Sequence, residues 1–119
     1  LVIGMGASTN SNYAAQYNLP GTIAPIADYG LLRKAVEVAE GRGIHVAVGN
    51  VLSSDVFYNA DPTFNDRWKE MNILCVEMEA AALYLNAARS GNKALCICTI
   101  SDSLVHGTAC SAEQRQTNR

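Results

Sequence analysis

The chain has 119 residues, of which 49% are hydrophobic and 17% are charged, and this composition is typical of a globular domain rather than of a disordered segment. Nine Lys and Arg residues stand against eleven Asp and Glu residues, which gives a formal net charge of −2. Because there is no excess of positive charge to bind nucleic acid or an anionic membrane, we expect a small-molecule ligand or a protein partner.

The first half of the chain predicts two strands and one helix. Residues 1–7 form a buried-strand pattern, and residues 8–21, which are rich in Ser, Thr, Asn and Tyr, lack either periodicity and predict a loop. Asp28 is a candidate N-cap for a helix that Gly41 would end. Residues 44–48 then predict a second strand.

The second half predicts a ligand loop, two helices and two strands. Residues 49–58 place small polar residues and an aromatic pair directly after a strand, which marks a candidate ligand loop. Asp61 and Pro62 predict the start of a helix, because Asp favours the N-cap and Pro favours the first helical position. That helix should turn Phe64, Trp68 and Met71 inward and close at Asn72. The remaining predicted elements are a strand at 73–76, a helix at 78–90 that Gly91 stops, and a strand at 94–101.

This alternation of strands and helices predicts an α/β fold with a central sheet that is covered on both sides. The chain opens directly on a strand pattern and closes on the first turns of a helix without an apolar face, so we expect residues 1–119 to be a single partial domain. Two acids, Glu79 and Asp102, follow predicted strands. Because ligands of open α/β sheets bind at the carboxyl ends of strands, we expect both acids to lie in one site.

The four cysteines are Cys75, Cys96, Cys98 and Cys110, and most of them lie in apolar stretches, as core thiols do. Cys96 and Cys98 would share one face of a strand, but no second pair of Cys or His residues accompanies them at the spacing of a zinc site. We therefore expect no metal ion and no cofactor. Reduced thiols, together with the lack of an apolar run of roughly 18 residues, predict a cytoplasmic protein.

Four motifs follow one another along the chain. They are Val-Gly-Asn through Ser-Ser-Asp-Val-Phe-Tyr at 48–58, Val-Glu-Met-Glu-Ala at 76–80, Thr-Ile-Ser-Asp at 99–102 and Ala-Glu-Gln-Arg-Gln at 112–116. Together they resemble the bacterial hexameric-type purine nucleoside phosphorylases, over nearly the whole chain and roughly the carboxyl-terminal half of that family's usual length. The resemblance implies a three-layer αβα fold with a central mixed sheet, and a homohexamer.

The resemblance also implies roles for the residues that bind the nucleoside. Glu79 matches the carboxylate that accepts hydrogen bonds from the 2′- and 3′-hydroxyls of ribose, since an ionised carboxylate has lone pairs for both. Met78 packs on the sugar and Val76 lines the base pocket. Phe57 packs on the purine, and Tyr58 lies near the ribose. Three further substrate-binding positions are Glu77, Ser54 and Ser101.

Two residues carry the chemistry that the resemblance implies. Asp102 matches the acid that protonates the purine at N7, and Arg115 matches its basic partner. Cleavage of the N-glycosidic bond leaves positive charge on the sugar and negative charge on the base. A carboxylic acid neutralises that base only if it stays protonated near neutral pH, which desolvation favours, and the approach of Arg115 then favours transfer of the proton.

The implied reaction is the reversible phosphorolysis of purine ribonucleosides and 2′-deoxyribonucleosides in purine salvage, with inorganic phosphate as the co-substrate. No glycine-rich phosphate cradle is visible in the sequence, so we expect that these residues alone do not turn over nucleoside. Ser103 and Leu104 stand where many members of the family have His-Ile, which leaves the preference for 6-amino or 6-oxo purines open.

Other interpretations of these residues are open. A nucleosidase of the same fold would use water instead of phosphate, and a non-catalytic fragment would only bind nucleoside or assemble. Glu79 could interact with the dipole of its helix, and Asp102 could be a cap or turn residue. The aromatic pair at 57–58 could belong to the core, and Arg115 could be a solvated helix residue.

Overall fold

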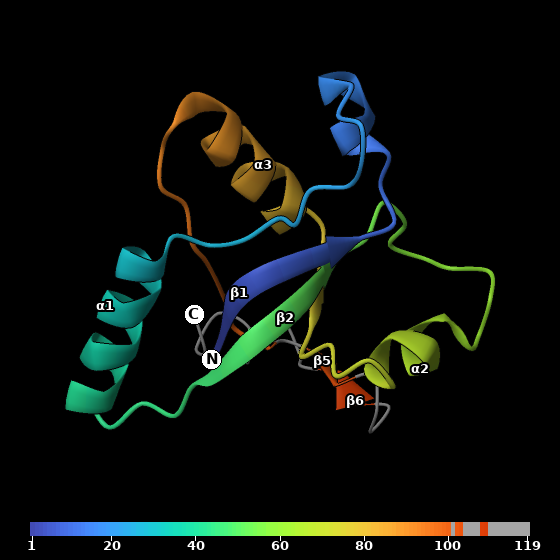
Figure 1. Cartoon of the computed structure of the whole chain (residues 1–119). Coiled ribbons are helices and arrows are strands. Elements are labelled where there is room, and N and C mark those ends of the chain that lie inside the picture. Colours follow the sequence, from blue (N-terminus) through green and yellow to red (C-terminus); the bar gives the residue numbers. More distant parts are fainter. Residues whose placement is uncertain (101, 104–107, 110–119) are drawn as a thin grey trace.

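The computed structural model describes residues 1–100, 102–103 and 108–109, and it contains a mixed sheet of four strands (Figure 1). In spatial order these are β3 (Val76–Glu77), β2 (Ala47–Ser53), β1 (Val2–Thr9) and β4 (Cys96–Cys98). The pairs β1–β2 and β2–β3 are parallel, whereas β4 runs antiparallel to β1. A separate antiparallel pair consists of β5 (Asp102–Ser103) and β6 (Thr108–Ala109). The α/β class and the mixed sheet are therefore confirmed.

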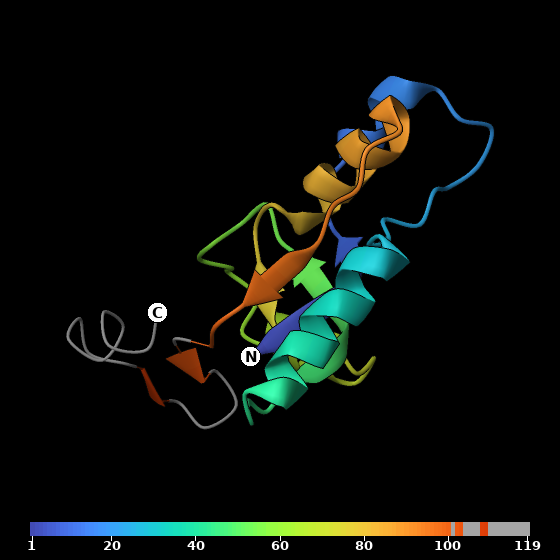
Figure 2. The ribbon, with the colours of Figure 1, turned by 90° about the vertical axis from the view of Figure 1, so that its left-hand side faces the viewer.

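The helices of the described chain lie around this sheet (Figure 2). They are the 3₁₀ helix η1 (Tyr13–Tyr17) and the α-helices α1 (Tyr29–Gly41), α2 (Phe64–Lys69) and α3 (Ala80–Ser90). Both α1 and α3 contact β1, and α3 also contacts β2 and η1. None of the helices in the described part of the chain has the length and apolarity that a membrane crossing needs.

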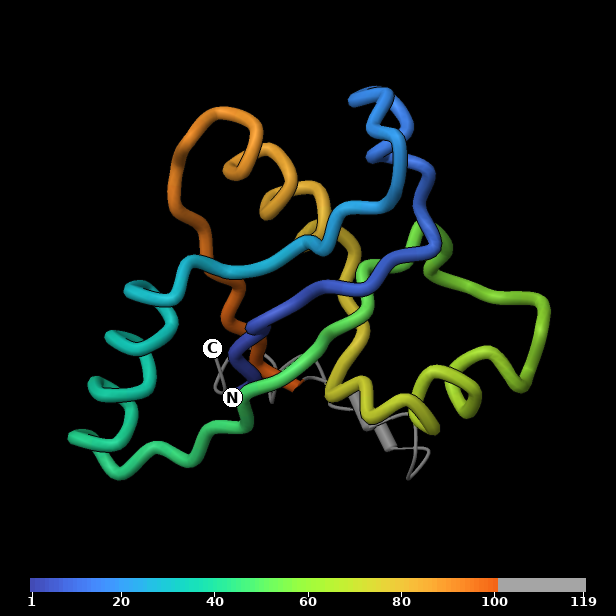
Figure 3. Tube along the Cα trace, viewed as in Figure 1, coloured from blue at the N-terminus to red at the C-terminus, as the bar shows by residue number. Residues whose placement is uncertain are grey.

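An extended segment between η1 and α1 runs alongside β1 (Figure 3). The amide of Ala7 donates to the carbonyl of Pro25 at 2.9 Å, and the amide of Ala27 donates to the carbonyl of Met5 at 3.0 Å. The register between β1 and β2 shifts at Met5, as in a β-bulge. The pairing of β4 with β1 ends at Gly4, and the extended segment pairs with β1 beyond that point.

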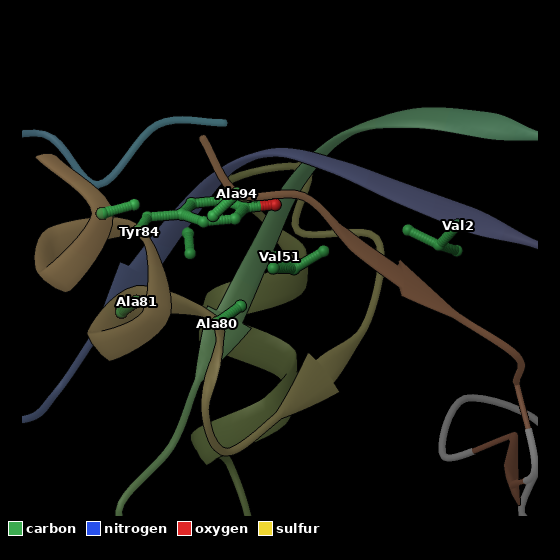
Figure 4. Close-up of a cluster of buried hydrophobic side chains, with 8 residues drawn as sticks. Val2, Val51, Ala80, Ala81, Tyr84 and Ala94 are labelled. Atoms are coloured by element: carbon green, nitrogen blue, oxygen red, sulfur yellow. The ribbon is translucent and has the colours of Figure 1, made fainter. Parts of the chain in front are cut away.

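The main core lies between α3 and the sheet, and Tyr84 is its largest fully buried side chain (Figure 4). The Tyr84 hydroxyl donates to the carbonyl of Gly4 and accepts from the amide of Cys96 at 2.9 Å. These bonds join α3 to both β1 and β4. A Cβ at Gly4 would lie 3.3 Å from the Tyr84 hydroxyl, so the glycine leaves room for this contact. The cluster comprises Val2, Ala7, Val51, Ala80, Ala81, Tyr84, Ala87 and Ala94.

The opposite face of the two central strands is covered only in part. Val2 and Val51 belong to the cluster under α3, whereas Ile3 and Leu52 point to the other face because side chains alternate along a strand. Ile3 is 1% exposed and Leu52 is fully buried. Val48 and Ile97, which pair with Ile3 on this face, are 40% and 52% exposed, so the described residues cover the face only in part and the prediction of a sheet covered on both sides is met only in part.

The predicted ends of two helices agree with the structure. The Asp28 carboxylate accepts a hydrogen bond from the amide of Leu31 at 2.9 Å and so caps α1. Gly91 ends α3 with a φ of 71°, in the left-handed region that glycine adopts without strain. Asn72 likewise takes a positive φ after α2. Local residue preferences therefore fixed these boundaries.

Two strands differ from their predicted bounds. The strand predicted at 44–48 is β2, which begins at Ala47 and continues to Ser53, so half of the predicted ligand loop is strand. The reason is burial, since Val51 and Leu52 are fully enclosed between neighbouring elements. β1 likewise extends through Thr9 into the predicted loop, and the rest of that loop contains η1.

The later elements differ in extent. Asp61 does not cap α2; its carboxylate accepts from the amide of Thr63 at 2.9 Å and forms a turn before the helix. Met71 is exposed, contrary to the prediction that it faces inward, because α2 has already ended. The strand predicted at 73–76 is β3 at Val76–Glu77, and the strand predicted at 94–101 is the shorter β4.

Candidate functional site

The carboxyl ends of the three parallel strands meet at one edge of the sheet, where β1 ends at Thr9, β2 at Ser53 and β3 at Glu77. The Thr9 hydroxyl donates to the carbonyl of Ser53 at 2.8 Å, and the amide of Ser54 donates to the carbonyl of Glu77 at 2.8 Å. The three strand ends are thereby tied together. This edge is where ligands of open α/β sheets bind, and we name it the strand edge.

Glu77 connects the strand edge to the start of α3. One carboxylate oxygen accepts from the Ser53 hydroxyl, and the other accepts from the amides of Glu79 and Ala80, each at 2.7 Å. The Ser53 hydroxyl also accepts from the amide of Ala81 at 2.8 Å. The first amides of α3 are therefore satisfied within the chain, and this helix terminus does not present them to a phosphate.

Glu79 occupies the N-cap position of α3, but its own side chain makes no capping hydrogen bond and is exposed. None of the ion pairs within residues 1–100 involves it. Met78 and Val76, on either side of Glu77, also expose a substantial part of their surface. Glu79 and Met78 are thus exposed consecutive residues where β3 leads into α3, whereas Val76 pairs with Leu52 and shares the face of the sheet away from α3.

Phe57 and Tyr58 follow β2 and are 72% and 87% exposed, so the interpretation that they belong to the core is wrong. Their ring centroids are 4.7 Å apart, with the planes at 79°. Ser54 anchors the start of this loop: it is buried, and its hydroxyl donates to the carbonyl of Val56 at 2.8 Å. The amide of Asp55 donates to the side chain of Asn10 at 2.9 Å, which ties the loop to the end of β1.

Asp102 does not reach the strand edge by way of β4. Cys98, the last residue of β4, pairs with Val2 at the start of β1, so β4 ends at the opposite end of the sheet from Ser53 and Glu77. The expectation that both acids follow strands ending at one edge is therefore wrong, because β4 is antiparallel. Asp102 belongs to β5, and Ser101 and Arg115 lie outside the described residues.

Three free cysteines gather beside the core under α3. The sulfur atoms of Cys96 and Cys98 are 3.5 Å apart. A hydrogen bond with the Cys75 thiol lowers the pKa of Cys98, although burial acts in the opposite direction. Burial is the main cause that raises the pKa of Cys96, and the hydrogen bond with Cys98 is the main cause that raises the pKa of Cys75. The described residues contain no group of three metal-binding side chains, and Cys110 lies outside them.

A hollow of about 380 Å³ lies between η1 and α3, away from the strand edge. Tyr17, Leu19, Leu85 and Arg89 are among its lining residues, and none of the predicted site residues contributes to it. Phe57, Tyr58, Met78 and Glu79 are all exposed to solvent. Ser53, to which the sequence interpretation gave no role beyond its place in the motif at 48–58, is buried at the strand edge and binds both Glu77 and the amide of Ala81.

Comparisons with known proteins show the family to which the chain is similar. Residues 2–119 match the family described as the phosphorylase superfamily. The chain is 49% identical over 116 residues to a protein of Tolumonas auensis named purine nucleoside phosphorylase DeoD-type, with 98% of this chain and 49% of that protein covered. Proteins of the same name from Yersinia enterocolitica and Clostridium novyi are 47% and 40% identical over 117 residues, with 98% of this chain and 48% and 50% of those proteins covered. The chain spans about half the length of the curated relatives it matches.

Proposed function

We propose, because this chain belongs to the phosphorylase superfamily, that the protein containing it is a purine nucleoside phosphorylase. The observation that carries the proposal is the similarity to proteins of that name along 98% of the chain. The reaction is the reversible phosphorolysis of purine ribonucleosides and 2′-deoxyribonucleosides to the free base and the sugar 1-phosphate. Inorganic phosphate is the co-substrate, and we place the protein in the cytoplasm.

The strand edge supports a role for Glu79 as the acceptor for the sugar hydroxyls. Its carboxylate is exposed, carries no capping bond and follows Met78, whose side chain is available to pack on the sugar. Phe57 and Tyr58 present exposed rings that can pack on the nucleoside. Charge-assisted hydrogen bonds from two hydroxyls to one carboxylate give both affinity and a fixed orientation.

Asp102 is proposed as the acid that protonates N7 of the leaving base, with Arg115 as its partner. Support for these two roles comes from the matching motifs alone. A protonated carboxylic acid lowers the barrier because negative charge develops on the purine as the glycosidic bond breaks. The attacking phosphate stabilises the sugar cation, and we place its binding groups outside these residues. A homohexamer is proposed on the same resemblance.

Glu79→Gln tests the proposal in the complete protein. Gln keeps the size of the side chain but removes the charge, so kcat/KM for inosine should fall roughly 10- to 100-fold. The assay is release of hypoxanthine with and without inorganic phosphate. Glu40→Gln, at an exposed position of α1, is the matched control and should leave the rate unchanged.

Two results would overturn the proposal. Cleavage of inosine at equal rates without phosphate would identify a nucleosidase that uses water. Complete absence of cleavage by the unaltered protein would leave a binding or assembly role, and calorimetry with inosine would then measure binding directly.

A further inference from the structure

We propose that Ser53 and Glu77 are positioning residues, which fix the first turn of α3 and thereby hold the Glu79 carboxylate in place for the sugar hydroxyls. They do so without contacting the substrate themselves. This inference rests on the function proposed above and assigns Glu77 a different role from the substrate contact that the sequence resemblance implies.

Both carboxylate oxygens of Glu77 already accept hydrogen bonds from other groups of this chain. One carboxylate oxygen holds the Ser53 hydroxyl, and the other holds two amides of the first turn of α3. The carboxylate also lies at the positive end of the helix dipole, where a negative charge stabilises the helix. Moving this carboxylate toward a ligand would leave two amides, those of Glu79 and Ala80, without their acceptor.

The Ser53 hydroxyl is committed as well. It is 4% exposed, gives its only proton to Glu77 and accepts from the amide of Ala81 at 2.8 Å. The carbonyl of Ser53 accepts from the Thr9 hydroxyl at 2.8 Å, so the residue is anchored to β1 too. Ser53 therefore has no hydroxyl proton left to donate to a ligand, and its hydrogen bonds fix the start of α3 relative to the sheet.

The Glu79 side chain is not needed to cap α3, because Glu77 and Ser53 accept hydrogen bonds from the first amides of the helix. A Ser, Thr, Asp or Asn residue at the N-cap position usually satisfies the helix amides with its own side chain, and Glu is not among these preferred residues. At the start of α3 that task belongs to Glu77 and Ser53, and the Glu79 side chain makes no capping bond. The amide of Glu79 is held by Glu77 at 2.7 Å, so the backbone that carries the free carboxylate is fixed.

A double-mutant cycle in the complete protein tests this inference. Ser53→Ala should lower kcat/KM for inosine roughly 10- to 100-fold, because a displacement of about 1 Å in a positioned group has an effect of that size. In a Glu79→Ala background the same substitution should change kcat/KM less than about 2-fold, because the group that Ser53 positions is gone. Glu77→Gln should show the same pattern of losses. Because Gln retains one acceptor oxygen, this variant still tests the inference if Ser53→Ala fails to fold.

The substrate supplies a second readout. With 2′,3′-dideoxyinosine, which lacks both hydroxyls, the kcat/KM of Ser53→Ala should differ from that of the unaltered protein by less than about 2-fold. A general loss of structure would instead lower the activities on inosine and on 2′,3′-dideoxyinosine by the same factor. Ser90→Ala is the matched control at the other end of α3, where the hydroxyl donates to the carbonyl of Asn86 at 2.8 Å; it should leave kcat/KM unchanged.

The outcomes separate the two proposals. Equal losses for Ser53→Ala and Glu77→Gln with and without Glu79 would overturn the positioning role while leaving the phosphorylase function intact. If Glu77→Gln alone caused equal losses with and without Glu79, that result would assign Glu77 a direct contact with substrate. Absence of phosphorolysis in the unaltered protein would overturn both proposals.

Discussion

The two longer helices, α1 and α3, differ in how they are attached to the sheet. α1 has 13 residues and buries only Ala39, whereas α3 has 11 residues and buries five of them. The buried residues of α3 are Ala80, Ala81, Tyr84, Leu85 and Ala87. Several large apolar side chains of α1 remain exposed, among them Tyr29 and Val38. α3 is thus part of the core, and α1 lies at its margin.

The first turns of the two helices also differ, because only that of α3 is held by a residue from a distant strand. α1 is capped by the adjacent Asp28, a contact within three residues. α3 is capped by Glu77 and by Ser53, and the bond from Ala81 to Ser53 spans 28 residues of sequence. The helix whose start depends on a distant strand also carries Glu79 at its N-cap position. A tertiary cap of this kind frees the local acidic residue for a ligand.

The largest effect expected from this comparison is at Tyr84. Tyr84→Ala removes a buried ring and two hydrogen bonds, so the free energy of unfolding should fall by about 3–5 kcal/mol. Denaturant unfolding of the protein measures it. Tyr29→Ala on α1 is the matched control, because Tyr29 is 73% exposed, and its effect should stay within about 0.5 kcal/mol. Equal losses at the two tyrosines would show that α1 is as firmly packed as α3.

A smaller effect is expected at the cap of α1. Asp28→Ala leaves the amide of Leu31 without its acceptor, so the free energy of unfolding should fall by about 1 kcal/mol. Asp28→Asn keeps an acceptor oxygen at the same place and should restore most of the loss. Thermal or denaturant unfolding compares the two variants. A loss in Asp28→Asn as large as that in Asp28→Ala would mean that the charge rather than the hydrogen bond matters.

The smallest effect is expected at the ion pair of Arg33 and Glu37 on α1, where the two side chains are 3.1 Å apart and mostly exposed. Glu37→Gln should lower the free energy of unfolding by no more than about 0.5 kcal/mol, and the difference should disappear in about 1 M salt. Unfolding curves at two salt concentrations measure it. A salt-independent loss above about 1 kcal/mol would contradict the view that α1 is held mainly by its apolar face and its local cap.

Sequence patterns predicted much of the fold because the relevant forces act locally. Asp28 and Gly91 mark helix ends through their own backbone and side-chain preferences, and apolar runs mark the strands. Ser53 was missed because a serine at the end of an apolar run carries no local sign of its partners. The partners of these three hydrogen bonds lie on β1, β3 and α3, and only the packing of these elements against β2 brings them near Ser53.

Strand direction is the other feature that local patterns could not supply. A run such as Cys96–Cys98 has the same apolar pattern whichever way it enters the sheet. Its antiparallel pairing with β1 places the end of β4 at the opposite end of the sheet from Glu77. For that reason the rule that ligands bind at the carboxyl ends of strands correctly placed the ends of β2 and β3 together, but it did not place Asp102 with them.

The sequence by itself determined the α/β class and the helix ends at Asp28 and Gly91, because each depends on residue preferences along a short stretch of chain. The tertiary structure alone decided that Ser53 holds both the Glu77 carboxylate and the amide of Ala81, whereas the bonds of Glu77 to the amides of Glu79 and Ala80 lie within three residues. Hydrogen bonds between residues 24 and 28 positions apart form only after the strands have paired, so no local pattern encodes them.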